Sequence, residues 1–241
     1  MDRRIYLSMS GAKATMQRQD VLAHNLANVS TNGFREELQS FRAVPVRGEG
    51  ASTRAFALET TTGYNPEPGH VVATGRKLDV AVKGNAWLAV QGLDGSEAYS
   101  RAGALDVDAQ GTLVTRSGLT VLGGGGPISI PQNAEVSIGG DGTVSARVPG
   151  GAPTPVGRLK LVTAEAPLKR GEDGLFRGPE GDLDADPTAQ VQDSALESSN
   201  VSAVSTMVAM IAAARQFEAQ MKSMQTAEKD EQQAQQLLSL N

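Results

Sequence analysis

Residues 201–226 read VSAVSTMVAMIAAARQFEAQMKSMQT, and their apolar pattern predicts a long helix with one face for a partner. Apolar side chains recur at alternating steps of three and four residues, which is the spacing of a coiled-coil seam. The seam consists of Met207, Met210, Ala214, Phe217, Met221 and Met224, and its start is widened by Val201, Val204, Val208 and Ile211. Asn200 or Ser202 can cap the start of the helix. The seam turns polar from Glu228 onward, where we expect packing to weaken.

The first 44 residues carry a second apolar stripe at the same spacing. Its members are Ile5, Met9, Ala12, Met16, Ala23 and Leu26, with Gln19 interrupting the row. The pair Asn32-Gly33 supplies a left-handed stop for a helix over residues 3–29, which would measure roughly 40 Å. Isolated helices are marginal in water, and a helix cannot bury its own stripe. We therefore expect the two ends of the chain to pack on each other and then on copies of themselves.

Glycine and proline divide the chain into parts. All eleven prolines and 25 of the 27 glycines lie between Pro45 and Pro187, and both residue types disfavour helix interiors. We therefore expect an α+β protein with paired long, coiled-coil-like terminal helices and a central all-β domain. Residues 1–44 with 188–241 would form a discontinuous helical polymerisation domain. Residues 45–75 would be an extended connector with little regular structure, and residues 76–187 a β-rich outer domain.

Short alternating runs between residues 76 and 178 predict strands joined by tight turns. Leu78–Val82 and Ala86–Val90 flank the turn Lys83-Gly84-Asn85. Further runs occupy residues 105–107, 113–114, 128–130, 136–138, 143–146 and 158–162. Because aromatic residues make up only 4% of the chain, we expect the core of this domain to be mostly aliphatic.

Composition excludes several classes of function. With 22 basic and 27 acidic residues, the chain lacks the basic footprint of a nucleic-acid binder. It has no cysteine, which excludes disulfides and thiolate metal sites, and only His24 and His70 as histidines. The apolar run after Arg3 and Arg4 is too short for a signal-peptide core. No stretch approaches the ~20 apolar residues that span a bilayer, so we expect no direct membrane insertion.

Partial matches to ligand-binding or catalytic motifs have simpler interpretations. Asp106–Gly111 begins like a calcium loop, but Ser117 stands where a bidentate Glu is required, so we expect a hairpin turn. Gly123–Gly126 is followed by Pro127 instead of the Lys-Ser or Lys-Thr of a phosphate-binding loop. A nucleophilic triad would have to use one of the two histidines, and no Gly-x-Ser-x-Gly elbow accompanies them. We therefore expect no catalytic residue, no cofactor and no metal.

One polar stretch is not explained by helix termination alone. It reads Asn25-Leu26-Ala27-Asn28-Val29-Ser30-Thr31-Asn32-Gly33-Phe34 and is dense in side chains that hydrogen-bond to the backbone. A helix end followed by a turn accounts for Asn32-Gly33. It does not account for the other two asparagines with Ser30 and Thr31.

This decapeptide resembles the signature of the flagellar basal-body rod and hook proteins, in which it closes the N-terminal helix of the axial core. Other stretches resemble family motifs in the same order. Thr74–Val82 is similar to the TG-x-x-LDVA start of the β domain, Tyr99–Gly103 to a Y-[ST]-R-x-G turn, and Leu196–Val201 to the LE-x-SNV start of the terminal helix. Within the family the resemblance is greatest to a proximal-rod subunit, with the distal-rod subunit or another rod or hook paralogue as the alternative.

The resemblance implies a structural subunit of the periplasmic rod that polymerises through its terminal helices and transmits torque for swimming. It implies export by the flagellar type III apparatus and, as partners, copies of itself and other rod proteins. The expected helix-packing interface comprises Ile5, Met9, Ala12, Met16, Leu26, Val204, Met207, Val208, Met210, Ile211, Ala214, Phe217, Met221 and Met224. A β-rich binding module, the rival class, would explain the middle of the chain but not two matched amphipathic ends.

Overall fold

The computed structural model describes residues 2–45 and 55–238 of the chain. It divides into two units. The helical unit takes residues 1–29, 36–65 and 201–241, and the β unit takes residues 30–35 and 66–200. Relative to the predicted terminal domain, the helical unit gains residues 45–65, whereas residues 30–35 and 188–200 belong to the β unit.

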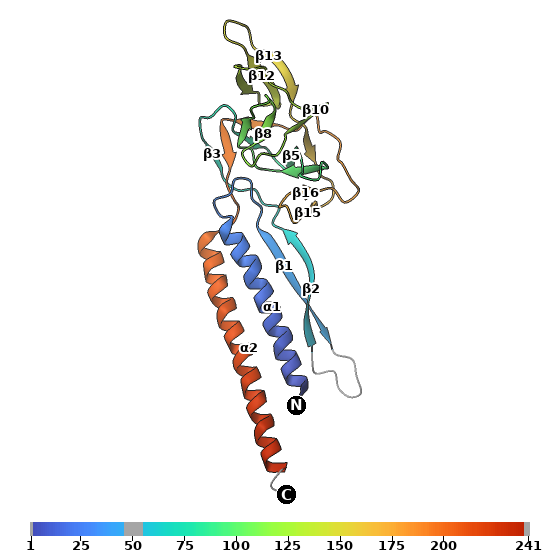
Figure 1. The fold of residues 1–241 in the computed structure, drawn as a ribbon, viewed down its shortest axis with the longest axis vertical. Coiled ribbons are helices and arrows are strands. Elements are labelled where there is room, and N and C mark those ends of the chain that lie inside the picture. The colour runs from blue at the N-terminus through green and yellow to red at the C-terminus, as the bar shows by residue number, and fades with distance from the viewer. Residues whose placement is uncertain (1, 46–54, 239–241) are drawn as a thin grey trace. The chain divides into compact units, whose positions relative to one another are not determined.

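The helical unit contains two helices and one β-hairpin (Figure 1). Helix α1 spans Asp2–Ala27 and helix α2 spans Ala203–Leu238, in the two segments where the apolar stripes predict helices. Strands β1 (Glu37–Pro45) and β2 (Ala55–Tyr64) pair antiparallel. Helix α1 lies between α2 and this hairpin.

The hairpin is the main difference from the sequence-based expectation. Residues 55–64 form β2 and residues 71–73 form β3, although the composition of residues 45–75 favoured an extended connector with little regular structure. β2 is rich in threonine, which suits a strand, and its pairing with β1 satisfies the backbone groups of both segments. The stretch 46–54, also part of the predicted connector, lies outside the described residues.

The C-terminal end of α1 and the N-terminal end of α2 both have side-chain caps. The Ser202 hydroxyl accepts a hydrogen bond from the Ser205 amide at 3.4 Å, so Ser202 rather than Asn200 caps α2. The side-chain Nδ2 of Asn28 donates to the His24 carbonyl at 2.9 Å and satisfies one of the last carbonyls of α1. Gly33 follows with φ of 69°, the left-handed conformation predicted for it.

The β unit is built from short strands. Their bounds are β3 Val71–Ala73, β4 Val80–Val82, β5 Ala86–Gln91, β6 Glu97–Ser100, β7 Leu105–Val107, β8 Leu113–Thr115, β9 Leu122–Gly123, β10 Gly126–Pro127, β11 Glu135–Ile138, β12 Thr143–Arg147, β13 Thr154–Arg158, β14 Leu161–Thr163, β15 Lys169–Arg170, β16 Phe176–Arg177, β17 Val191–Asp193 and β18 Ala195–Glu197. The largest sheet has the order β14-β5-β6-β16-β15, and a second has the order β11-β12-β13. The other pairs are β17-β4, β18-β3, β7-β8 and β10-β9.

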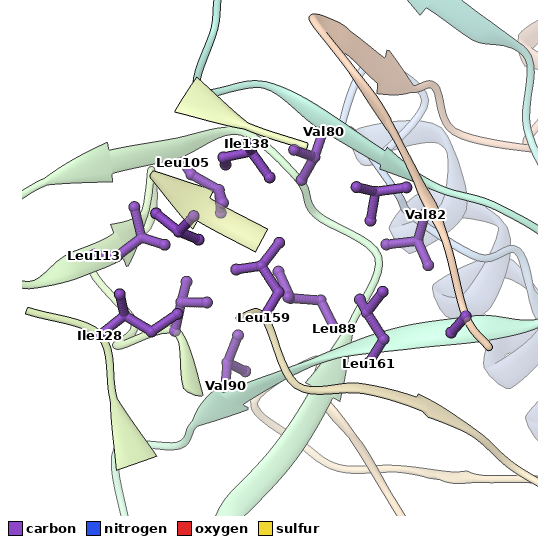
Figure 2. Packing of buried hydrophobic residues seen from close by; sticks show 14 of the residues in the cluster. Val80, Val82, Leu88, Val90, Leu105, Leu113, Ile128, Ile138, Leu159 and Leu161 are labelled. Carbon is purple, nitrogen blue, oxygen red and sulfur yellow. The ribbon is translucent and has the colours of Figure 1, made fainter. Parts of the chain in front are cut away.

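The core of the β unit is aliphatic, as the composition predicts. Leu88, Val90, Leu105 and Leu113 are completely buried in a cluster of Val, Leu, Ile and Ala side chains. Figure 2 shows these side chains converging from several strands. The partial calcium loop is the β7–β8 turn, in which the Asp108 carboxylate accepts hydrogen bonds from the Gln110 and Thr112 amides.

We expect Leu113→Ala to lower the free energy of unfolding of the β unit by about 2–5 kcal/mol, because it leaves a cavity in the core. Leu93→Ala is the matched control, since Leu93 is 92% exposed whereas Leu113 is 0% exposed. Its effect should stay within about 0.5 kcal/mol. Urea denaturation followed by the fluorescence of Trp87, the single tryptophan, measures both. Equal losses for the two variants would contradict the core described here.

Candidate functional site

The most buried residues of the two helices are small or polar. Ala12 and Thr15 of α1 and Thr206, Ala213 and Ala227 of α2 are each less than 9% exposed. The helices run antiparallel, with the Ser8 hydroxyl 3.3 Å from that of Ser223, and a Cβ on Gly11 would lie 3.0 Å from the Gln220 side chain. Small side chains at these positions let the helix axes approach closely.

About half of the large apolar side chains described on the two helices are exposed instead. We define the α1 patch as Tyr6, Met9 and Met16, and the α2 patch as Val204, Met207, Val208 and Ile211. Their exposed fractions run from 49% for Met207 to 74% for Val204, and Met221 is 38% exposed. Of the other residues predicted to pack between helices, Ala12 is buried, and Ile5, Leu26, Met210, Ala214, Phe217 and Met224 are half-buried.

Each helix therefore has two adjacent heptad-like rows. The covered rows are Ile5, Ser8, Ala12, Thr15, Gln19, Leu22 and Leu26 on α1, and Thr206, Met210, Ala213, Phe217, Gln220, Met224 and Ala227 on α2. The stripes predicted from apolar spacing agree with these rows at every second position, for example Ile5 and Ala12. At the positions between, the predicted residue is the chain neighbour of the covered one, for example Met9 next to Ser8. At the displaced positions the helix pair of a single chain covers smaller or polar side chains such as Ser8, Thr15 and Thr206, and leaves the neighbouring Met9, Met16 and Met207 exposed.

The first part of the signature segment joins α1 to the hairpin. Asn25 is 1% exposed, and its side-chain amide donates to the Glu37 carbonyl at 2.9 Å while its amide oxygen accepts from the Glu37 amide at 2.8 Å. The side chain thus pairs with β1 as a peptide group of a neighbouring strand would. His24 adds a contact from Nδ1 to the Glu37 carboxylate at 2.9 Å. These bonds explain an asparagine inside a helix, where its propensity is poor.

The second part of the signature segment belongs to the β unit. The Gly33 amide donates to the Glu197 carbonyl at 2.8 Å, and the Phe34 carbonyl accepts from the Asn200 amide at 3.3 Å. The Arg170 guanidinium lies 4.5 Å from the centre of the Phe34 ring, a cation–π distance. A Cβ on Gly33 would come within 2.3 Å of the Arg101 backbone, so this position has room only for glycine.

A buried carboxylate holds this region together. Glu197 is 1% exposed and lies between two arginines that are equally buried. Its Oε1 accepts from Arg35 Nη1 at 2.7 Å, and its Oε2 accepts from Arg101 Nη2 at 2.6 Å and Nε at 2.7 Å. We call these three residues the Glu197 clasp.

Both arginines of the clasp also donate to backbone carbonyls. Arg101 donates to the carbonyls of Val82 at 2.6 Å, Gly84 at 2.9 Å and Ala86 at 2.6 Å. Arg35 Nη1 donates to the Glu67 carbonyl at 2.6 Å, and the Gly69 amide donates to Glu197 Oε1 at 3.0 Å. Burying three charges is favourable only when hydrogen bonds compensate for lost hydration, and these bonds supply that compensation. The clasp therefore joins segments that lie far apart in sequence.

Sequence reasoning missed the clasp, although each member stands in or beside a recognised stretch. Arg35 follows the signature directly, Arg101 is the arginine of Tyr99–Gly103, and Glu197 is the glutamate of Leu196–Val201. A charged residue within or beside an otherwise apolar or glycine-rich motif is the feature that could have indicated these three residues. Spacing alone could not show that they meet.

The part of the chain that the structure describes was compared with the requirements of a metal site and of a membrane span. It contains no cluster of three or more His, Cys, Asp or Glu side chains placed to hold a metal ion. None of the helices within residues 2–45 and 55–238 is long and apolar enough to cross a membrane. His24 contacts Glu37, and the backbone carbonyl of His70 accepts a hydrogen bond from the Ser198 amide at 2.8 Å. The charged groups of the clasp serve structure.

We expect Glu197→Gln to destabilise the β unit by about 3–5 kcal/mol, because it leaves two buried guanidinium groups without a counter-charge. Glu135→Gln is the control. Glu135 is an exposed carboxylate whose pKa is lowered to about 2 by hydrogen bonds from Lys77 and Arg147, and its replacement should have little effect near neutral pH. Urea denaturation followed by Trp87 fluorescence compares the two, and similar losses would refute the role of the clasp.

The chain is similar to flagellar proteins over its whole length. Residues 5–35 match the family "Flagella basal body rod protein", residues 81–146 match "Flagellar hook protein FlgE/F/G D1 domain", and residues 192–237 match "Flagellar basal body rod FlgEFG protein C-terminal". The matched segments contain α1 with the signature, the strands of the β core, and α2 with Glu197.

Individual relatives agree with these matches. The chain is 46% identical to the flagellar basal-body rod protein FlgF of Escherichia coli strain K12 and 45% identical to FlgF of Salmonella typhimurium strain LT2, each over 100% of both chains. It is 33% identical to the basal-body rod protein FlgG of Agrobacterium fabrum over 94% of this chain and 95% of that protein. The chain therefore belongs to the flagellar basal-body rod protein family, as a structural component of the rod and not an enzyme.

Proposed function

We propose that the chain is built into the rod through the large apolar side chains that its two helices leave exposed. The observation that carries this proposal is the distribution of side-chain size within the helical unit. Ala12 and Ala213 are buried, whereas Met16 and Val208 are about six-tenths exposed. A chain that worked alone would gain stability by burying the larger side chains, since apolar burial stabilises in proportion to area.

The arrangement of the exposed apolar side chains along the helices supports the same proposal. The α2 patch is continuous from Val204 to Ile211, and the α1 patch consists of Tyr6 and Met9 with Met16 beyond the exposed Lys13. Exposed apolar surfaces of this kind mark sites of protein association. In this proposal the helical unit polymerises, the β unit forms the outer part, and stiffness comes from many small buried contacts between subunits.

Membership of the rod family indicates assembly with other rod or hook proteins such as FlgG. More specifically, we assign as partners further copies of this chain, which correspond to FlgF copies, together with FlgG and other proximal-rod subunits. We also assign export to the flagellar type III apparatus, on the ground of family membership. The higher identity to the FlgF relatives favours a proximal-rod position over the distal-rod position of FlgG.

We expect Val208→Asp to abolish incorporation into the rod and swimming, because it would bury an unpaired charge at the subunit contact. The β unit should keep its stability, as measured by Trp87 fluorescence during urea denaturation. Gln216→Asp is the matched control, since Gln216 is an exposed polar residue of the same helix. Immunoblots of isolated basal bodies and swimming assays in cells lacking the native gene give the readout. Normal amounts of Val208→Asp protein in rods would refute the proposal.

A further inference from the structure

Asn32 stands next to a glycine that the β unit requires. Gly33 has φ of 69°, and a Cβ at this position would meet the backbone of Arg101 and Ala102, so the fold excludes other residues there. Asparagine followed by glycine is also the pair most open to attack by the backbone on its own side chain, because glycine places no side chain beside the attacking nitrogen. A structural requirement and a chemical weakness therefore coincide at one peptide bond.

The reaction that threatens such a pair is deamidation. The Gly33 nitrogen loses its proton and attacks Cγ of Asn32, a carbon–nitrogen bond forms, and the side-chain nitrogen leaves as ammonia. Water then opens the five-membered succinimide at either of its two carbonyls. The products are aspartate, and isoaspartate, in which the main chain continues through the side-chain carbons. Both products add one negative charge, and isoaspartate also lengthens the main chain by one methylene group.

The folded β unit holds the attacking nitrogen in place. The Gly33 amide donates its proton to the Glu197 carbonyl at 2.8 Å. Gly33 is buried against the backbone of Arg101 and Ala102, which leaves its peptide plane little room to rotate toward the Asn32 side chain. The side chain of Glu197 is itself fixed in the clasp. Ring closure at Asn32 therefore requires local opening of this segment, and the clasp opposes that opening.

We propose that Asn32 is a latent deamidation site, closed in the folded chain by the bond from Gly33 to Glu197 and open whenever the β unit is unfolded. Asn32 is the only asparagine of the chain that glycine follows. The proposal concerns a single chain and does not depend on the proposed function. It has a consequence for folding, because a lengthened main chain at position 32 cannot present Gly33 to Glu197 in the same register. Chains that stay unfolded for long thus lose the ability to close the clasp.

Mass spectrometry of tryptic peptides measures deamidation at Asn32 after incubation of the full chain in mildly alkaline buffer, with and without urea. A synthetic peptide of residues 25–38 in both buffers controls for any effect of urea on the reaction itself. We expect the folded chain to react about tenfold or more slowly than the peptide, because only the opened fraction reacts. The unfolded chain should react as fast as the peptide. Equal rates for the folded chain and the peptide would overturn the protection, and an unfolded chain that keeps Asn32 intact would overturn the site.

Glu197→Gln tests whether the clasp keeps the site closed. Without urea, this variant should deamidate at Asn32 about tenfold or more faster than the unmodified chain, because its segment opens more often. Glu135→Gln is the matched control and should keep the original rate, since Glu135 lies outside the clasp. Trp87 fluorescence reports how much of each variant is folded, and a largely unfolded Glu197→Gln chain should react at the rate of the peptide. An unchanged rate in Glu197→Gln would overturn the role of the clasp.

Refolding tests the consequence of the modification. Chains modified in urea carry an added negative charge and are separated from unmodified chains of the same sample by ion-exchange chromatography. After removal of urea, chains with isoaspartate at position 32 should not regain the Trp87 fluorescence of the folded β unit, whereas the unmodified chains should. Refolding of both to equal stability would overturn the link between this site and the clasp.

Discussion

The contact between Glu197 and its two arginines holds together the β-unit segments where the chain enters and leaves that unit. The chain passes from one unit to the other after residues 29, 35, 65 and 200. On the β-unit side, the segments next to these points are hydrogen-bonded to one another. Glu197 binds Arg35 and the Gly69 amide, and the Asn200 side chain donates to the Glu67 carbonyl. The β unit can therefore be interrupted by the hairpin and flanked by helices without losing the register of its first and last strands.

The helical unit follows a different physical rule. The most buried side chains between its helices are alanine and threonine, which bury little apolar area per residue, and larger apolar side chains such as Leu26, Met210 and Phe217 are half-buried. Met9, Met16, Val204, Val208 and Ile211 remain more than half exposed, where they contribute little to the stability of a solitary chain. The β unit has a complete aliphatic core, and the helical unit is a component whose apolar surface is completed by neighbours. This difference matches a protein that is a part of a larger structure.

The sequence predicted features that depend on periodicity and not those that depend on tertiary pairing. Both helices were predictable because a stripe at three- and four-residue steps fits only a helix, and the strands near Leu88 and Leu113 because alternation is visible locally. The β1–β2 hairpin was not, since nothing local indicates that residues 55–64 pair with residues 37–45. At every second position, the residue predicted to be covered was the chain neighbour of the one that the helix pair covers. The prediction followed the large apolar side chains, whereas the helix pair buries smaller or polar ones at these positions.

The signature segment illustrates the same limit at the level of single residues. Its density of asparagine indicated backbone hydrogen bonds, and Asn25 and Asn28 make them. Which backbone Asn25 would bind could not be predicted, because Glu37 lies in a strand that the sequence pattern did not reveal. The clasp was hidden for a related reason, since its three charges are separated by long stretches of chain and only the folded β unit brings them together.

The position of Glu197 also sets the timing of folding during synthesis. Its bonds to Arg101 and Gly69 span 96 and 128 residues of sequence. A nascent chain cannot close the clasp until this late carboxylate has been translated, and contacts between such distant residues form slowly. Most of the polypeptide is thus made before its β unit can lock.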